Sequence, residues 1–271
     1  MDAHRLKLAL IVGPPESSYP GNNDFVTELA CEFDWLRPVA ALRVPELSVD
    51  RLEALAGPFI GVALYTASRL DDGRLESAAL QEVPSDVWEW LTRHRWLVSV
   101  NDVCLSRSPD SGWAAWLSIL EDYPDLRLLI SHLGLPEAAP DSPPGTAHWT
   151  VEQCRERIAD VLAFAAYPGP RIKLSGFYAL TSPSYDYPHQ TAWGYVEALL
   201  EEFTASRLLW ASDYPPALTG GNLSFPQTID LLGKMPFLTD EEREKIEGGN
   251  LLALVEEVKA SETSGDSTAK L

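Results

Sequence analysis

Basic residues, cysteines and long apolar runs are all scarce in this chain. It has 21 Lys and Arg against 40 Asp and Glu, a formal net charge of −19 over 271 residues. This balance argues against nucleic acid and anionic membranes as partners, because both need a basic surface. The three cysteines lie far apart without a Cys-x-x-Cys pair, so neither a disulfide framework nor a thiolate zinc site is expected. No apolar stretch reaches the roughly 20 residues of a membrane span, and the first residues do not read as a signal segment. We therefore expect a cytoplasmic protein that acts on a small molecule.

The end of the chain offers an alternative location. Ala269-Lys270-Leu271 resembles a variant of the Ser-Lys-Leu peroxisomal address, which is read at a free C-terminus. Residues 259–271 are polar and without periodicity, so we expect a disordered tail after a domain that spans residues 1–258.

What the chain does have is a repeated alternation of short apolar runs with amphipathic stretches, which predicts a parallel sheet with crossover helices. We expect strands at 8–12, 38–44, 59–65, 96–100, 126–132, 171–175 and 207–213. We expect helices near 24–33, 48–56, 85–94, 112–122, 150–166, 193–204, 225–233 and 239–258.

The number and length of these units favour one large barrel over two small domains. The predicted fold class is α/β, a (β/α)8-like TIM barrel that is distorted or incomplete, because the seven strands lack the one that should come first. An open seam covered by the terminal helices, a homodimer whose second subunit covers it, and a coding start further upstream are the alternatives.

Two of the apolar runs end on an ionisable residue. Leu128 begins a run that stops at His132, and Leu208 begins one that stops at Asp213. Barrel enzymes carry their chemistry where the parallel strands end, so His132 and Asp213 are the first candidates for an active site. Alternatively, His132 is a core histidine before the turn at Gly134, and Asp213 is a turn residue ahead of prolines.

The motifs around these residues resemble the amidohydrolase-related TIM-barrel hydrolases, which include 2-pyrone-4,6-dicarboxylate lactonase, sugar lactonases and several nonoxidative decarboxylases. The resemblance covers about residues 1–255, and it rests on the segments 130–134 (ISHLG), 172–176 (IKLSG), 209–215 (LWASDYP) and 249–252 (GNLL). It implies a distorted (β/α) barrel in which His132 and Asp213 match the histidine of strand six and the aspartate of strand eight.

The sequence departs from the metal-binding members of that family. It has five histidines but no His-x-His pair, and Asn101 stands where the histidine of strand five is expected. A catalytic zinc needs three protein ligands and a water. His132 and Asp213 would supply two and Asp102 a third, a set whose carboxylates would also suit Mn²⁺ or Mg²⁺. The cofactor expectation is none, or one divalent metal, Zn or Mn, on these three residues.

The 2-pyrone-4,6-dicarboxylate lactonase branch of this family is metal-independent, and the resemblance to it implies an acid/base route. Asp213 would be general base on water or acid to the leaving group, and His132 would orient substrate or water. Lys173 is the candidate cation for the oxyanion, although it could instead point into the layer between strands and helices. The other candidates for substrate contact are Asn101, Asp102, Tyr65, Arg69 and Tyr178.

The predicted function is hydrolysis of a lactone, ester or similar carbonyl in a small organic or aromatic metabolite. A nonoxidative decarboxylase of the same family is one alternative. A catalytically degenerate barrel that binds a ligand or partner is another, and the missing His-x-His pair and Asn101 favour it.

Overall fold

The structure, a computed structural model, describes residues 6–14, 19–65, 67–69, 75–77, 80–101, 112–138 and 149–265. Asp102 and the C-terminal tripeptide therefore lie outside the described residues, and of Arg69 only the backbone is described.

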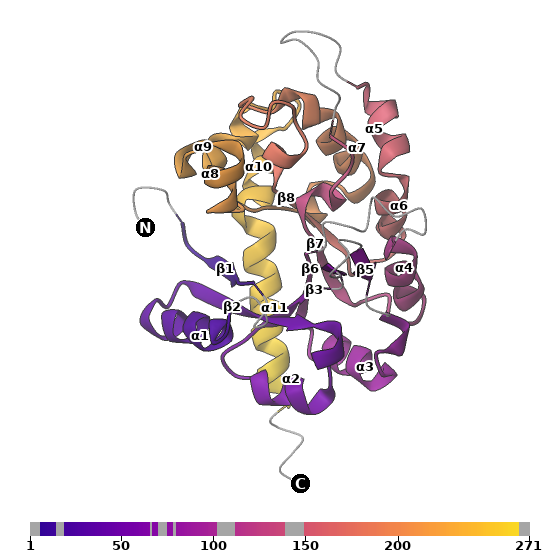
Figure 1. Ribbon diagram of the computed structural model, residues 1–271, viewed down its shortest axis with the longest axis vertical. Helices are drawn as coiled ribbons and strands as arrows, with labels where there is room; N and C mark the ends of the chain where they lie inside the picture. Colours follow the sequence, from indigo (N-terminus) through magenta and orange to yellow (C-terminus); the bar gives the residue numbers. More distant parts are fainter. Residues whose placement is uncertain are drawn as a thin grey trace.

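The architecture is a curled sheet of seven parallel strands with helices packed around it (Figure 1). Along the sheet the strands follow the order β1 (Ala9–Val12), β2 (Leu36–Arg43), β3 (Gly61–Tyr65), β6 (Leu97–Val100), β7 (Arg127–Ile130), β8 (Arg171–Leu174) and β9 (Leu208–Trp210). All seven predicted strands are thus confirmed. No pairing joins β1 to β9 within the described residues, so the barrel is incomplete there, as predicted. A short antiparallel hairpin, β4 (Ala67–Arg69) and β5 (Leu75–Ser77), was not predicted.

The α-helices are α1 (Asn22–Glu32), α2 (Val49–Leu55), α3 (Ser85–Arg93), α4 (Gly112–Asp122), α5 (Val151–Arg157), α6 (Ala159–Leu162), α7 (Trp193–Phe203), α8 (Pro216–Gly221), α9 (Phe225–Asp230), α10 (Asp240–Glu244) and α11 (Asn250–Gly265). Single turns of 3₁₀ helix are η2 (Val44–Glu46), η3 (Leu80–Glu82), η5 (His132–Gly134), η6 (Ala163–Ala166), η7 (Phe177–Ala179), η8 (Gln190–Ala192), η9 (Ala205–Arg207) and η10 (Leu232–Lys234), and η11 (Lys245–Gly249) is a π-helical turn. Within the described residues no helix is both long and apolar enough to cross a membrane.

The core lies between the sheet and its helices because the strands are apolar on both faces. In β7, Leu128, Leu129 and Ile130 are each fully buried, as expected of a parallel strand covered on both sides. Helix α3 contributes Trp88, whose ring meets Trp116 of α4 edge-on at 5.8 Å.

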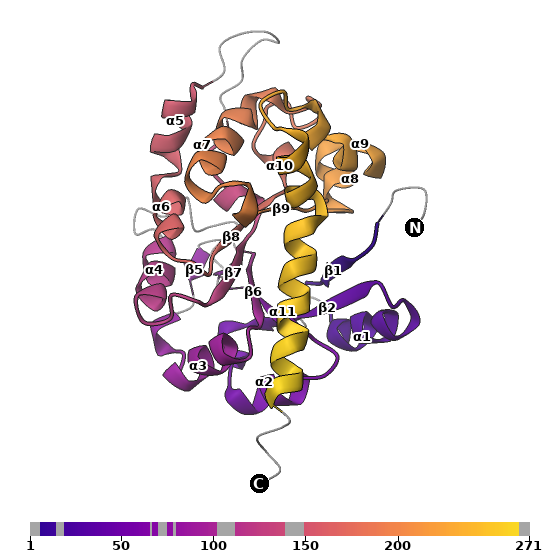
Figure 2. The ribbon, with the colours of Figure 1, turned by 180° about the vertical axis from the view of Figure 1, so that it is seen from behind.

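The long helix α11 lies across the amino-terminal ends of the strands, and Figure 2 shows it running past β9 towards α2. Asn250 Nδ2 donates to the carbonyls of Ala205 at 2.7 Å and Leu208 at 2.8 Å, where β9 begins. Further along, Glu257 forms an ion pair with Arg127, the first residue of β7. These contacts cover one end of the sheet, so that a ligand is expected at the opposite, carboxyl-terminal end.

Helix α11 also corrects the predicted tail. It runs to Gly265, so residues 259–265, expected to be disordered, are helical. The cause lies in tertiary contacts that the polar composition does not reveal. Val258 is fully buried, and Ser261 Oγ donates to the carbonyl of His94 at 2.8 Å.

Candidate active site

Five of the predicted site residues gather at the carboxyl-terminal ends of β6, β7, β8 and β9. Asn101 follows β6, His132 follows β7, Lys173 lies in β8, Tyr178 follows β8, and Asp213 follows β9. His132 Nδ1 and Asp213 Oδ2 are 3.7 Å apart, and the two side chains are 21% and 18% exposed. The Tyr178 hydroxyl donates to Asp213 Oδ2 at 2.8 Å. The structure therefore brings the two first candidates together, within reach of solvent.

The backbone at this end of the sheet is held in an uncommon conformation. His132 has φ 55° and Asp213 has φ 49°, in the left-handed region that costs most non-glycine residues about 1–3 kcal/mol. Gly176 has φ +66°, and a Cβ on it would lie 2.6 Å from His132 Nδ1. Only glycine fits beside the imidazole here. Strain of this kind concentrates at functional sites.

Ser175, which the sequence analysis did not single out, fixes the imidazole of His132. Its Oγ accepts the backbone N–H of His132 at 3.3 Å and lies 2.9 Å from Nδ1. A serine oxygen can accept twice and donate once, so either partner can supply the hydrogen of the Ser175–Nδ1 bond. Nε2, which has no partner among the described residues, is the ring nitrogen of His132 that is left for a ligand. At 3.7 Å the contact with Asp213 is too long for a hydrogen bond.

Lys173 turns inward to other polar groups rather than into the layer between strands and helices, the alternative left open above. Its Nζ donates to Ser99 Oγ at 2.7 Å. Ser99 in turn donates to Asn101 Oδ1 at 3.1 Å, and Ser131 Oγ donates to the same oxygen at 2.6 Å. The lysine and the asparagine thus belong to one hydrogen-bonded chain inside the barrel.

Burial sets the charge states at this site. It lowers the pKa of Lys173 to about 8, against the opposing attraction of Asp213. Burial also lowers the pKa of His132 below its usual 6.5; Asp213 opposes that shift and Lys173 reinforces it. Burial, and then the hydrogen bond to Asp213, raise the pKa of Tyr178. At neutral pH the site therefore holds an ammonium, a neutral imidazole and a phenol that acts as a donor.

Tyr65, another predicted contact, lies at the end of β3. Its hydroxyl donates to the carbonyl of Gly13 at 2.8 Å, which ties the end of β3 to the end of β1. Asp102 and the side chain of Arg69 lie outside the described residues. Sequence reasoning missed Ser99, Ser131 and Ser175, although all three are polar residues in or directly after buried strands and are at most 4% exposed.

The described residues do not fit a metal well. They contain no group of three or more His, Cys, Asp or Glu placed to hold an ion, and a catalytic zinc needs three protein ligands. His132 and Asp213 are two. Asn101 cannot readily be a third, because its oxygen already accepts from Ser99 and Ser131.

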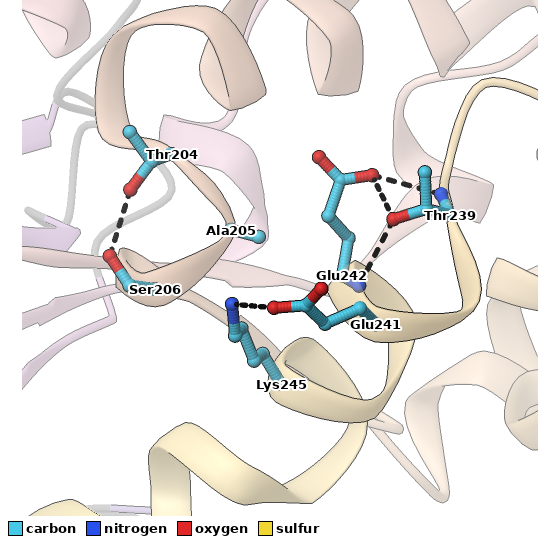
Figure 3. A pocket seen from close by; sticks show the side chains of 7 residues that line it. All are labelled: Thr204, Ala205, Ser206, Thr239, Glu241, Glu242 and Lys245. Carbon is cyan, nitrogen blue, oxygen red and sulfur yellow. Dashed lines mark hydrogen bonds and ion pairs between the residues drawn. The ribbon is translucent and has the colours of Figure 1, made fainter.

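A surface pocket lies elsewhere, near the start of β9 (Figure 3). Its polar side chains bond to one another: Lys245 Nζ donates to Glu241 at 2.7 Å, and Thr239 and Glu242 form a capping box. With these groups already paired and at the amino-terminal end of the strand, the pocket does not compete with the site described above.

Comparisons with known proteins agree on the fold. A family profile described as Amidohydrolase matches residues 17–255. An L-fucono-1,5-lactonase from Burkholderia ambifaria is 32% identical over 108 residues, which are 40% of this chain and 33% of that protein, so the match spans about a third of the relative's length.

Three solved structures are similar over most of their length. A zinc-bound amidohydrolase from Burkholderia multivorans has a TM-score of 0.68 and 18% identity, covering 94% of this chain and 84% of that one. A probable 2-pyrone-4,6-dicarboxylic acid hydrolase from Acinetobacter baumannii, with citric acid bound, has a TM-score of 0.65 and 18% identity. The match covers 93% of this chain and 85% of that one. A 2,6-dihydroxybenzoate decarboxylase from Rhizobium has a TM-score of 0.57 and 15% identity. The match covers 94% of this chain and 85% of that one. At these identities they show the TIM-barrel fold.

Proposed function

Because this chain belongs to the amidohydrolase family, we propose that it hydrolyses a lactone or related ester carbonyl of a small organic or aromatic metabolite. The observation that most supports this is a carboxylate and a cation on two paired strands: Asp213, 18% exposed, follows β9, and Lys173 lies in β8 with its ammonium held by Ser99. Hydrolysis of a lactone needs a base for water and a positive group for the oxyanion.

Asp213 is the base in this proposal. Its Oδ2 accepts from Tyr178 at 2.8 Å, and its Oδ1 has no protein partner among the described residues, so Oδ1 is the atom that takes a proton from water. The water oxygen adds to the carbonyl carbon, and the carbonyl oxygen becomes an oxyanion beside Lys173. When the ring C–O bond breaks, Asp213 returns the proton to the leaving oxygen, giving the open hydroxy acid.

His132 and Tyr178 are positioning and binding groups in this scheme. Nε2 of His132 forms a hydrogen bond with the substrate or the water, and the lowered pKa of the imidazole keeps the ring neutral. Tyr178, with its raised pKa, keeps Asp213 in one orientation. No step is routed through a metal, because the described donor set does not fit one.

The identity of the substrate follows only by analogy. The sugar lactonase match supports a lactone, and the decarboxylase neighbour makes release of CO₂ the second reaction to test. A dicarboxylate substrate would need cations besides Lys173, because His132, the other basic side chain described in this group, is neutral at pH 7.

The test is turnover of L-fucono-1,5-lactone, dihydrocoumarin and 2-pyrone-4,6-dicarboxylate, with 2,6-dihydroxybenzoate as the decarboxylation probe. Asp213→Asn should abolish lactone opening with an unchanged melting temperature, because Asn tolerates the left-handed backbone at φ 49° and can still accept from Tyr178. Tyr178→Phe is the matched control and should retain part of the rate. Full activity of Asp213→Asn would refute the proposal, CO₂ release would replace it with the decarboxylase, and tight binding without turnover would indicate a degenerate barrel.

A further inference from the structure

Part of the hydrogen-bonded chain inside the barrel has no role in the scheme above. Lys173, Ser99, Asn101 and Ser131 come from the neighbouring strands β6, β7 and β8 or from the residues that follow them, and they are joined at 2.7, 3.1 and 2.6 Å. Ser99 is 1% exposed and Ser131 is 4% exposed. Two hydroxyls buried this deeply need hydrogen-bond partners, and both donate to the amide oxygen of Asn101.

The chemistry of the donors fixes the direction of this chain. An ammonium has hydrogens and no lone pair, so Ser99 Oγ must accept from Lys173. The hydrogen of Ser99 then needs an acceptor, and Asn101 Oδ1 is the atom in reach at 3.1 Å. If the amide were turned over, its NH₂ would meet Ser99 instead, and the serine hydrogen would be left beside an ammonium with nowhere to go. The network therefore assigns the orientation of the Asn101 amide.

With both lone pairs of Oδ1 occupied, the NH₂ group of Asn101 faces away from the two serines. Among the described residues no hydrogen-bond partner of Nδ2 is found, whereas Oδ1 has two. Lys173 uses one of its three N–H groups on Ser99. Because Lys173 and Asn101 are bound to the same Ser99 oxygen, their free N–H groups lie within two hydrogen bonds of each other.

We propose that Asn101 Nδ2 and Lys173 Nζ together bind the carbonyl oxygen of the substrate as it becomes an oxyanion, and that Ser99 and Ser131 are positioning residues that hold the amide with its nitrogen towards the substrate. This rests on the hydrolysis proposed above. It adds a neutral donor to the cation, and it gives Asn101, which stands where the family resemblance implies a histidine, a role in binding rather than in metal ligation.

Fixed donors of this kind act where charge develops, so their loss lowers kcat more than it raises KM. Asn101→Asp is the sharpest variant because the carboxylate can still accept from both serines but has no hydrogen to donate. We expect kcat for dihydrocoumarin to fall about 10²- to 10³-fold, with KM within about twofold and the melting temperature unchanged. A kcat within about threefold of the wild type would overturn the inference.

The positioning role has its own test. Ser131→Ala removes one of the two hydrogens that hold Oδ1, and kcat should fall about tenfold, by analogy with the loss of a hydrogen bond to a catalytic amide. Ser131→Thr keeps the hydroxyl and should restore most of the rate. A purely structural serine would instead lower the melting temperature without a matching loss of kcat, and Thr would not rescue turnover.

A binding measurement makes the test independent of turnover. The open hydroxy acid of dihydrocoumarin carries an anionic oxygen, so its addition should shift the ¹⁵N side-chain amide resonance of Asn101, identified by its absence in Asn101→Asp. No shift at saturation would overturn the inference. Failure of the proposed function looks different, because the wild type would then not open dihydrocoumarin, or Asp213→Asn would remain active. An inactive Asp213→Asn beside a fully active Asn101→Asp would refute the Asn101 role alone.

Discussion

His189 gives the folded chain a pH-dependent stability that can be measured without a substrate. The residue is fully buried and stacks on Phe177 with ring centroids 6.3 Å apart. Thr181 Oγ1 donates to the carbonyl of Phe177 and therefore accepts from His189 Nδ1 at 2.9 Å. Nε2 is left as a buried lone pair without a partner among the described residues. Burial lowers the pKa of His189 from 6.5 to about 4, with Asp186 opposing the shift.

The sign of the effect follows from this depressed value. Below pH 6.5 the unfolded chain binds a proton at His189 that the folded chain does not bind. The stability that the neutral imidazole contributes is therefore present above pH 6.5 and is lost as the pH falls towards 4. With these two values, one titrating site lowers the free energy of unfolding by about 2 kcal/mol between pH 7.5 and pH 5.

The measurement is urea unfolding at pH 7.5 and pH 5 for the wild type and for His189→Asn. Asparagine can donate to Thr181 and tolerates the φ of 61° at this position, but it does not titrate. Between pH 7.5 and pH 5 the unfolding free energy of the wild type should fall by about 2 kcal/mol more than that of the variant. Other titrating groups contribute equally to both proteins, so their contribution cancels in this comparison. Equal losses in the wild type and in His189→Asn would refute the reasoning and mean that another group takes up the proton.

Three further results are expected. If the ammonium of Lys173 binds the oxyanion, kcat/KM should fall about tenfold per pH unit above pH 8, where Lys173 loses its proton. Lys173→Arg should move this alkaline limb of the pH profile above pH 10. A limb that stays at the same pH would belong to another group. Gly176→Ala should lower stability by more than Gly57→Ala, because both carry a positive φ but only at Gly176 would the Cβ meet His132; thermal unfolding of the pair gives the comparison. Asn250→Ala should lower the unfolding free energy in urea by about 1–3 kcal/mol, the cost of leaving the carbonyls of Ala205 and Leu208 unpaired, and a loss below a few tenths would mean that water replaces the amide.

The strands of this fold could be predicted from the sequence because each is a short, largely apolar run between polar segments, the strongest signal that a parallel sheet leaves. The missed elements lack such a signal. Helix α8 begins at Pro216 inside a run rich in Pro and Gly, which is typical of a turn, although proline also suits the first position of a helix. The break between α5 and α6 falls at Ile158, with φ −113°, where neither Gly nor Pro interrupts the pattern.

The residues of the candidate site likewise include some that could be predicted from the sequence and some that could not. His132 and Asp213 could be predicted because they end apolar runs, and the charge of Lys173 inside a strand marked it for attention. Which way Lys173 turns could not be predicted, since period-two alternation shows which residues share a face of the strand but not which face lies inside the barrel. The serines were overlooked because a single hydroxyl is a weak signal in a sequence.

Their positions nevertheless held information. Ser99, Ser131 and Ser175 lie in or directly after three neighbouring strands, β6, β7 and β8, and each is next to a buried apolar residue. A hydroxyl costs stability in such a place unless it is hydrogen-bonded, and one serine alone is easily satisfied by the backbone. Three at the same end of adjacent strands indicate a shared set of polar partners, which here are His132, Lys173 and Asn101. For an incomplete barrel of this kind, small hydroxyl residues at strand ends are therefore as informative about the site as the ionisable residues that they hold.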